Sequence, residues 1–499
     1  MLGRPLFKVN LFLNWMNYKF FAIPNYLLGV KFLYLKKKLM NTPKLFLIAF
    51  GFSIPQLFAQ AIPGTLNWYN GEGQGMYTDQ AYKMLKKKKS QPVVVAVIDS
   101  GVDIEHEDLQ GKIWVNTNEI PGNKIDDDKN GYVDDVHGWN FLGNAAGENQ
   151  ENARLEMTRI YAKLKDKYEG VDGSSLFDAS EFYMYNEARS KVEGEIENLA
   201  QYKEALENGL FDAETKKYIE DQLNYNLNIY YDDRSLIGDN PDDFTDTHYG
   251  NGDVEGPDAL HGTHVSGIIG AIRGNDKGGD GVAENVKIMS VRAVPNGDEQ
   301  DKDVALAIRY AVNNGAKVIN MSFGKSFSIH QREVYEAMAY ADSMGVLMVH
   351  AAGNDAKDVD VEPNFPTSKY AFQEKPFANL LTIGASTRME GSERVADFSN
   401  FGQQSVDVFA PGLEIYNSVP QSAYMNLQGT SMAAPMVTGA AAMLKSYFPS
   451  LSMWEIKTII LQTATVYKDN EFPTKSVTGG IVNLKSAVKA CQKAEKSKK

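Results

Sequence analysis

The sequence is poor in several features on which particular classes of protein depend. Cys491 is its only cysteine, which excludes an intramolecular disulfide and a metal cluster held by several cysteines. It has no internal repeat and no low-complexity tract, which excludes solenoid and fibrous architectures. At 499 residues, with 43% hydrophobic and 23% charged residues, the chain has the composition of a globular protein with a substantial core.

Acidic residues are absent from the N-terminal segment, since no Asp or Glu precedes Glu72. That segment holds eight Lys or Arg residues, so the rest of the chain carries 43 basic against 64 acidic residues, a formal charge of −21. A body of this charge repels nucleic acid and anionic membranes. We therefore expect no nucleic-acid partner, and the oligomeric state stays open.

A secretory signal is predicted at residues 40–61, in the stretch "MNTPKLFLIAFGFSIPQLFAQA". Lys44 supplies its positive end, an apolar run follows, and Ala59-Gln60-Ala61 forms an A-x-A cleavage pattern. Residues 1–39 are then an upstream extension that is not native, and residues 62–92 form an N-terminal segment. The signal predicts export to the periplasm or the extracellular space.

A membrane anchor between Val9 and Leu35 is the rival interpretation of this region. Lys19, Pro24 and Lys31 interrupt that stretch, so no clean run of about 20 apolar residues remains. We expect no stable membrane insertion once the signal is removed.

Short apolar runs alternate with helical patterns from residue 93 onward. The run from Asp301 to Gly315, for example, has Val304, Ile308 and Ala311 at helical spacing. Strand, helix, strand alternation predicts an α/β fold with a mostly parallel sheet covered by helices on both faces. The predicted strands are 93–101, 286–294, 316–324, 346–354 and 380–386.

The segment 148–232 differs from this pattern because most of it has helical periodicity. Met157, Ile160 and Leu164 recur at three and four positions, and Ile219 and Leu223 begin a later set. We predict two or three amphipathic helices that form an inserted helical subdomain. A surface hairpin is favoured over a lid on the site.

Two histidines three apart occur in "HGTHVSG", residues 261–267. The spacing fits a metal pair, a core pair, or one base with a neighbour, because H-x-x-H is short. Elsewhere, Ser431 precedes a stretch of small residues with helical character, where free N–H groups stabilise an anion. A lone serine there would be an N-cap, but a serine nucleophile also needs a base, an orienting carboxylate and an oxyanion donor. His261, Asp99 and Asn354 supply these groups.

Five motifs in this order resemble those of the subtilisin-like serine proteases: "VVAVIDSGVDIEHEDL", "HGTHVSGII", "VINMSFG", "AAGN" and "GTSMAAP". The resemblance implies a subtilisin-like, three-layer α/β fold over residues 93–490, with 491–499 as a basic C-terminal tail. It also implies a serine endopeptidase that acts on polypeptides and needs no cofactor for catalysis. In the family pattern Ser431 is the nucleophile that forms an acyl-enzyme, His261 is the general base, and Asp99 orients it. Asn354 and the Ser431 N–H bind the oxyanion.

The same resemblance assigns a primary specificity pocket that pairs with an extended peptide by strand addition. Phe365-Pro366 resembles the family's aromatic-Pro step near this pocket. Acidic residues in 296–303 fit either basic or extended polar substrates or a solvated surface, and both alternatives stay open. The predicted pocket residues are Ser322, Phe323, Gly324, Ala352 and Gly353.

An acidic stretch, "NKIDDDKNGYVDD" at 123–135, has the spacing of an oxygen-donor calcium loop. It departs from an EF-hand because His137, not Glu, stands at the twelfth position. We predict a structural calcium held by Asp126, Asp128, Asn130, Tyr132 and Asp134, with an acidic turn as the alternative.

Two other classes of function compete with the protease. One is an inactive, peptide-binding relative, which is disfavoured because each catalytic position holds the required residue. The other is a metallohydrolase that uses His261 and His264, which lacks the Glu of H-E-x-x-H. We expect His264 to support the helix structurally.

Overall fold

The computed structural model describes residues 64–498 except 174–178, 203–207, 210 and 469–471. The predicted upstream extension and signal, residues 1–61, lie outside the described residues. Among the described helices, none is both long enough and apolar enough to cross a membrane.

A nine-stranded sheet forms the centre of the molecule, in the order β10-β11-β7-β6-β5-β4-β1-β3-β2. Every neighbouring pair is parallel except β10 with β11. The strands are β1 (Val93–Asp99), β2 (Gly138–Asn140), β3 (Val286–Arg292), β4 (Val318–Met321), β5 (Leu347–Ala351), β6 (Leu380–Ser386), β7 (Val408–Pro411), β10 (Thr465–Val466) and β11 (Gly480–Ile481).

The five predicted strands are confirmed as β1, β3, β4, β5 and β6. Their apolar runs are nearly continuous because helices bury both faces of the sheet. β6 has the predicted bounds, and the other four strands end two or three residues earlier than predicted. Those carboxyl ends carry the candidate site residues.

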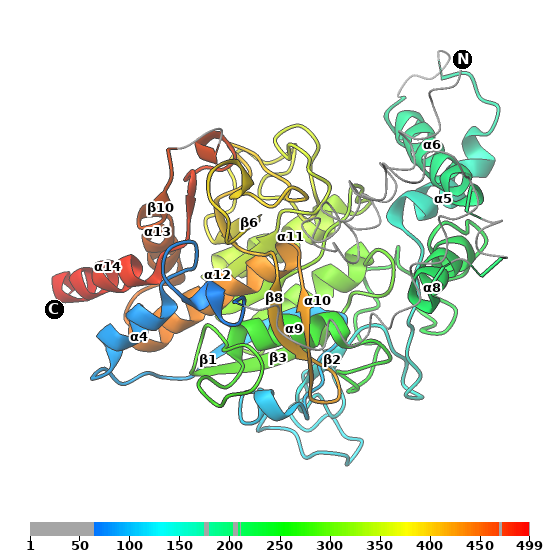
Figure 1. The fold of residues 1–499 in the computed structure, drawn as a ribbon. Helices are drawn as coiled ribbons and strands as arrows, with labels where there is room; N and C mark the ends of the chain where they lie inside the picture. Colours follow the sequence, from blue (N-terminus) through cyan, green and yellow to red (C-terminus); the bar gives the residue numbers. More distant parts are fainter. Residues whose placement is uncertain (1–63, 174–178, 203–207, 210, 469–471, 499) are drawn as a thin grey trace.

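Helices cover both faces of the sheet, which confirms the three-layer α/β architecture (Figure 1). One face packs against α4 (Thr78–Leu85), α9 (Leu260–Gly270), α12 (Thr430–Tyr447), α13 (Met453–Gln462) and α14 (Leu484–Ser497). The other packs against α10 (Asp301–Asn313) and α11 (Gln331–Ser343). The predicted helix near 301–315 is therefore present, and its Val304, Ile308 and Ala311 are buried as expected.

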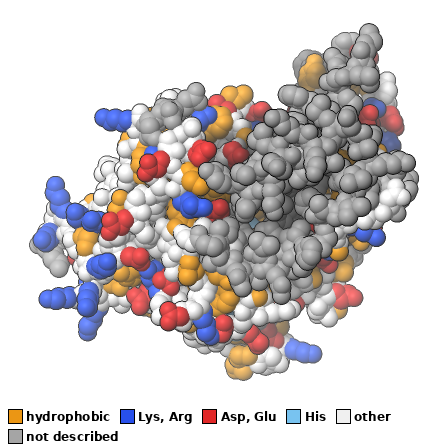
Figure 2. Space-filling view, viewed as in Figure 1, with side chains coloured by type: hydrophobic (Ala, Val, Ile, Leu, Met, Phe, Trp, Pro, Cys, Tyr) orange, Lys and Arg blue, Asp and Glu red, His pale blue; other side chains and the backbone are white. Residues whose placement is uncertain are grey.

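A two-stranded hairpin, β8 (Ile415–Val419) and β9 (Ala423–Leu427), packs against α9. Residues 491–497, predicted as a tail, continue α14, whose Cys491 is buried against the core. Lysines of α14 and of the segment around α4 form a basic edge of the molecule (Figure 2).

The segment 148–232 contains the described helices α5 (Glu156–Tyr168), α6 (Ser180–Ala200) and α8 (Ala213–Asp221), followed by the π-helical turn η4 (Gln222–Asn226). They lie to one side of the sheet (Figure 1). Their apolar faces form a cluster separate from the two sheet cores, with Ile160, Tyr185 and Val192 fully buried. Phe327, from the loop after β4, packs against this cluster and joins it to the body of the molecule.

Candidate active site

Asp99 and His261 meet at the carboxyl end of β1. Asp99 is the last residue of that strand and is 1% exposed, and His261 lies in the first turn of α9. Nδ1 of His261 lies 2.7 Å from Oδ1 of Asp99, which also accepts the Ser100 N–H at 2.8 Å. A carboxylate only accepts, so Nδ1 carries the proton and Nε2 is left to act as a base.

The surroundings of His261 shift its pKa in opposite directions. Burial lowers it, while the charge of Asp99 and the hydrogen bond to it raise it. The net pKa is above the ordinary value of 6.5.

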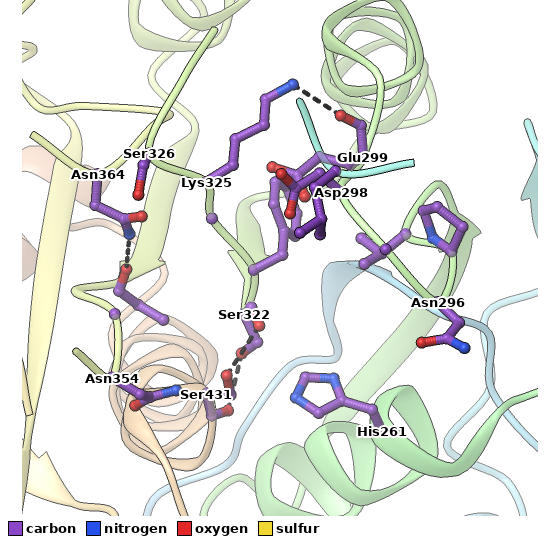
Figure 3. Close-up of a pocket in the computed structure, with 18 of the residues that line it drawn as sticks. His261, Asn296, Asp298, Glu299, Ser322, Lys325, Ser326, Asn354, Asn364 and Ser431 are labelled. Atoms are coloured by element: carbon purple, nitrogen blue, oxygen red, sulfur yellow. Dashed lines mark hydrogen bonds between the residues drawn. The ribbon is translucent and has the colours of Figure 1, made fainter. Parts of the chain in front are cut away.

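Ser431 lies in the first turn of α12, directly after Thr430, and faces the same cleft as His261 (Figure 3). Its hydroxyl donates to the Ser322 carbonyl at 3.0 Å, and the Ser322 hydroxyl donates back to the Ser431 carbonyl at 2.9 Å. The serine is therefore turned toward β4 and not toward His261. Hydrogen bonds between a nucleophile and its base are often long in ligand-free sites and shorten when substrate binds.

Asn354 lies beside Ser431, and Thr430 fixes the orientation of its amide (Figure 3). The Thr430 N–H and hydroxyl donate to Oδ1 of Asn354 at 2.8 and 3.0 Å. Because both donors face the oxygen, the NH₂ group of the amide is directed away from them. This orientation suits a donor to an anion at Ser431.

These groups line a cleft of about 590 Å³. Of the predicted pocket residues, Ser322, Phe323, Gly324 and Gly353 line it. The prediction for Ala352 is wrong, because this residue is fully buried and borders a separate small cavity. Side chains alternate along extended chain, so the neighbouring Ala351 faces the cleft instead.

Asn364 forms part of the same wall and was not predicted. Its Nδ2 donates to the Ala351 carbonyl at 3.3 Å, and a Cβ on Gly324 would lie 2.5 Å from that nitrogen. Glycine is therefore required at 324 for the wall to close. The following Phe365-Pro366 bond is cis.

The 148–232 segment also contributes residues to the lining of the cleft: Glu151, Leu155, Met157, Lys191, Glu195 and Gln222. A buried ion network joins this segment to the body. Nζ of Lys325, whose side chain is 2% exposed, lies 3.1 Å from Glu156 Oε2 and 2.9 Å from Asp301 Oδ1. The segment thus contributes part of the site's surface.

Glu299 lies in the same cleft, at the end distant from Ser431 (Figure 3). Burial raises the pKa of its carboxyl to about 8, against the opposing effect of the Lys325 ammonium. The acid-rich composition of 296–303 indicated that carboxylates lie near the cleft, but no sequence pattern distinguished Glu299 from its acidic neighbours.

The acidic loop brings together a different set of carboxylates from the one predicted. Oxygens of Glu119, Asp128 and Asp135 lie within 4.8 Å of one another, so of the three predicted carboxylate ligands, Asp126, Asp128 and Asp134, only Asp128 belongs to this group. Asp135 is fully buried, and burial raises the pKa of its carboxyl to about 6, against the effect of the hydrogen bonds that it accepts from Tyr310, Asn130 and Asn116. An all-oxygen donor set of this kind fits a hard cation such as calcium.

Backbone amides occupy the other predicted carboxylates. Asp126 accepts the N–H groups of Asn130 and Gly131, at 3.1 and 2.8 Å. Asp134 accepts those of Gly122 and Lys124, at 2.8 and 2.9 Å. The Asn130 side chain donates to Asp135, and the Tyr132 N–H donates to Asn130. The alternating acids therefore shape the turn.

His264 does not join His261 in a metal pair. Its Nε2 lies 3.1 and 3.2 Å from the carbonyl oxygens of Ile415 and Met425, and the ring is fully buried. It therefore ties α9 to both strands of the β8–β9 hairpin, and not to its own helix.

A buried carboxylate, an imidazole bonded to it and a serine at a helix N-terminus define the side-chain set of a serine hydrolase. The chain belongs to the subtilase family, whose model matches residues 90–480. A thermophilic serine proteinase from Bacillus sp. strain AK1 is 38% identical over 223 residues, which are 44% of this chain and 50% of that protein. The chain thus spans about half the length of that relative.

Two further proteins are similar to this chain, and the first of them supports the same family. Subtilisin DY from Bacillus licheniformis is 32% identical over 228 residues, which are 46% of this chain and 77% of that protein. A solved structure of proteases from Pseudoalteromonas arctica PAMC 21717 is 22% identical, with a TM-score of 0.49, and the match covers 85% of this chain and 97% of that chain.

Proposed function

We propose that this subtilase is a serine endopeptidase that hydrolyses polypeptides through an acyl-enzyme on Ser431. The observation that carries the proposal is the 2.7 Å bond between His261 and Asp99 in the cleft that Ser431 faces. That bond leaves Nε2 of His261 directed to accept a proton, which is what a serine needs to become a nucleophile.

In the proposed reaction, Nε2 of His261 takes the Ser431 proton as Oγ attacks the scissile carbonyl. The Asn354 NH₂ and the Ser431 backbone N–H donate to the oxyanion. His261 then gives its proton to the leaving amine, and water hydrolyses the ester by the reverse sequence. Asp99 holds the imidazole in one tautomer and stabilises its charged form.

The peptide would lie in extended conformation along Ser322–Gly324 and past Gly353. Support comes from their position in the cleft next to Ser431. Backbone pairing with these segments would fix the scissile carbonyl against the oxyanion donors.

The first test is Ser431→Ala, which should lower peptide hydrolysis by about six orders of magnitude and abolish labelling by a fluorophosphonate probe. Ser446→Ala is the matched control, because Ser446 lies on the same helix with its hydroxyl bonded to the Met443 carbonyl. Near-normal hydrolysis by Ser431→Ala would remove the assignment. A folded wild-type protein that binds peptides but neither reacts with the probe nor cleaves them would be the inactive binder, and activity lost only to a chelator would indicate the metallohydrolase.

We further propose that the protein is exported and that its signal is removed after Ala61. The support is the signal-like order of residues 40–61. N-terminal sequencing of the exported protein should give a terminus downstream of Ala61, and a terminus upstream of Met40 would exclude this proposal.

A further inference from the structure

Glu299 carries a buried carboxylate, one oxygen of which has no hydrogen-bond partner among the described residues. That oxygen is Oε1, and the residue is 2% exposed. It lies between β3 and α10 and lines the cleft that holds His261 and Ser431. A buried carboxylate oxygen that lacks a partner is costly, so its retention in a ligand cleft calls for an explanation.

Two cations, Lys325 and Arg159, pack around Glu299, but their N–H groups donate to acceptors other than its carboxylate. Lys325 directs its ammonium to Glu156, Asp301 and the main-chain carbonyl of Glu299, the last at 2.7 Å (Figure 3). With three N–H donors and three acceptors, none remains for the Glu299 carboxylate.

Arg159 of α5 is committed in the same way. Its Nη2 donates to the Glu299 carbonyl at 2.9 Å, and its other N–H groups donate to Glu156 and to the carbonyls of Arg154 and Asp298. Both cations therefore hold the main chain of Glu299 in place while leaving its side chain unmatched.

We infer that Glu299 forms a subsite that binds a cationic group of the peptide, an alkylammonium or guanidinium, on the acyl side of the scissile bond. This inference rests on the proposed function, in which the peptide lies along the wall from Ser322 to Lys325, and we place its acyl side there. Ser322 is bonded to Ser431 at one end of this wall, and Lys325 is bonded to Glu299 at the other (Figure 3). The charges around the subsite favour the same ligand. Lys325 and Arg159 are balanced by Glu156 and Asp301, so Asp298 and Glu299 remain as surplus acidic groups beside the subsite.

The test compares acetylated peptides that carry Lys or its neutral analogue norleucine at each acyl-side position in turn. At one position the ratio of kcat/KM for Lys to that for norleucine should reach about 10 to 100, the range of a hydrogen bond to a charged group. Glu299→Gln keeps the shape and should bring the ratio to about 1. Asp355→Asn removes an exposed carboxylate of the same cleft and should keep the wild-type ratio.

The wild-type protein alone supplies a second readout, which does not depend on whether a variant folds. Because the pKa of Glu299 is raised to about 8, the group is mostly neutral at pH 6.5 and mostly ionised at pH 9. The Lys to norleucine ratio should therefore rise over this range, while the titration of His261 cancels in the ratio.

The cationic group could belong to a side chain of the peptide or to its N-terminal α-ammonium. A parallel set of peptides with free N-termini distinguishes these two sources. If acetylated peptides show the preference, the ligand is a side chain; if only free N-termini do, the ligand is the α-ammonium of the substrate. Hydrolysis with no preference in either set, or a preference that survives Glu299→Gln, overturns the inference and leaves the proposed function intact. Failure of the wild-type protein to cleave any peptide would instead overturn the proposed function.

Discussion

At the scale of single residues, the hydrogen bond between Asp99 and His261 predicts how kcat/KM depends on pH. Since the charge of Asp99 raises the pKa of His261, and the neutral imidazole is the active form, kcat/KM should fall as the pH drops through a value above 6.5. Asp99→Asn should lower kcat/KM by about 10⁴ and move the acidic limb of the residual activity to lower pH. Rates on a neutral peptide between pH 5 and 9 measure both effects, and an unmoved limb would contradict the pairing.

Some of the individual residues of the site have positions that the sequence predicts, and others do not. Asp99 ends β1 and Asn354 follows β5. Parallel strands bring their carboxyl ends to one edge of the sheet, so the placement of both residues at that edge was predictable. Ala352 was misplaced because a one-residue step along extended chain reverses the side chain. Glu299 and Lys325 could not be foreseen, because their environment depends on Glu156, which lies 169 positions from Lys325.

At the scale of elements, buried histidines join helix and strand to neighbouring segments. His264 of α9 faces carbonyls of the β8–β9 hairpin, and His350 of β5 faces the Phe323 carbonyl at 2.8 Å. Burial lowers their pKa values from 6.5 to about 3 and about 4. The sequence predicted that His264 supports its own helix, but its partners are carbonyls of a hairpin that the sequence did not reveal.

These histidines predict an acid-sensitive fold. Their folded pKa values lie below the unfolded value, so below pH 6.5 the unfolded chain binds more protons and stability declines toward pH 4. The unfolded histidines become protonated only as the pH falls through 6.5, so these two groups together should lower the free energy of unfolding by roughly 3 kcal/mol between pH 6.5 and 5. The raised pKa values of Glu299 and Asp135 act in the opposite direction and offset part of this loss. Urea unfolding of the Ser431→Ala protein avoids self-digestion and measures the loss.

His264→Gln retains a donor and should reduce that acid dependence by about half, since one of the two groups is removed. His248→Gln, at an exposed histidine, is the control and should keep the full loss. An acid dependence of stability that is the same with and without His264→Gln would contradict the assignment.

At the scale of the whole molecule, the acidic loop connects to the sheet's helical layer, because the Tyr310 hydroxyl of α10 donates to Asp135 at 2.7 Å. A calcium ion held by Glu119, Asp128 and Asp135 would therefore stabilise the entire domain. Calcium at about 100 times its dissociation constant adds about 2.7 kcal/mol. For a domain of this size the melting temperature should then fall by about 3 °C when EGTA removes the ion.

Two variants distinguish bound calcium from an acidic turn. Asp128→Asn removes a carboxylate of the group and should abolish the EGTA effect, while Asp134→Asn, which weakens the bonds to Gly122 and Lys124, should lower the melting temperature equally with and without calcium. A wild-type melting temperature that is the same in millimolar calcium and in EGTA would show that backbone amides alone satisfy the loop. The 2.8 and 2.9 Å bonds that Asp134 accepts would then be its whole contribution to the fold.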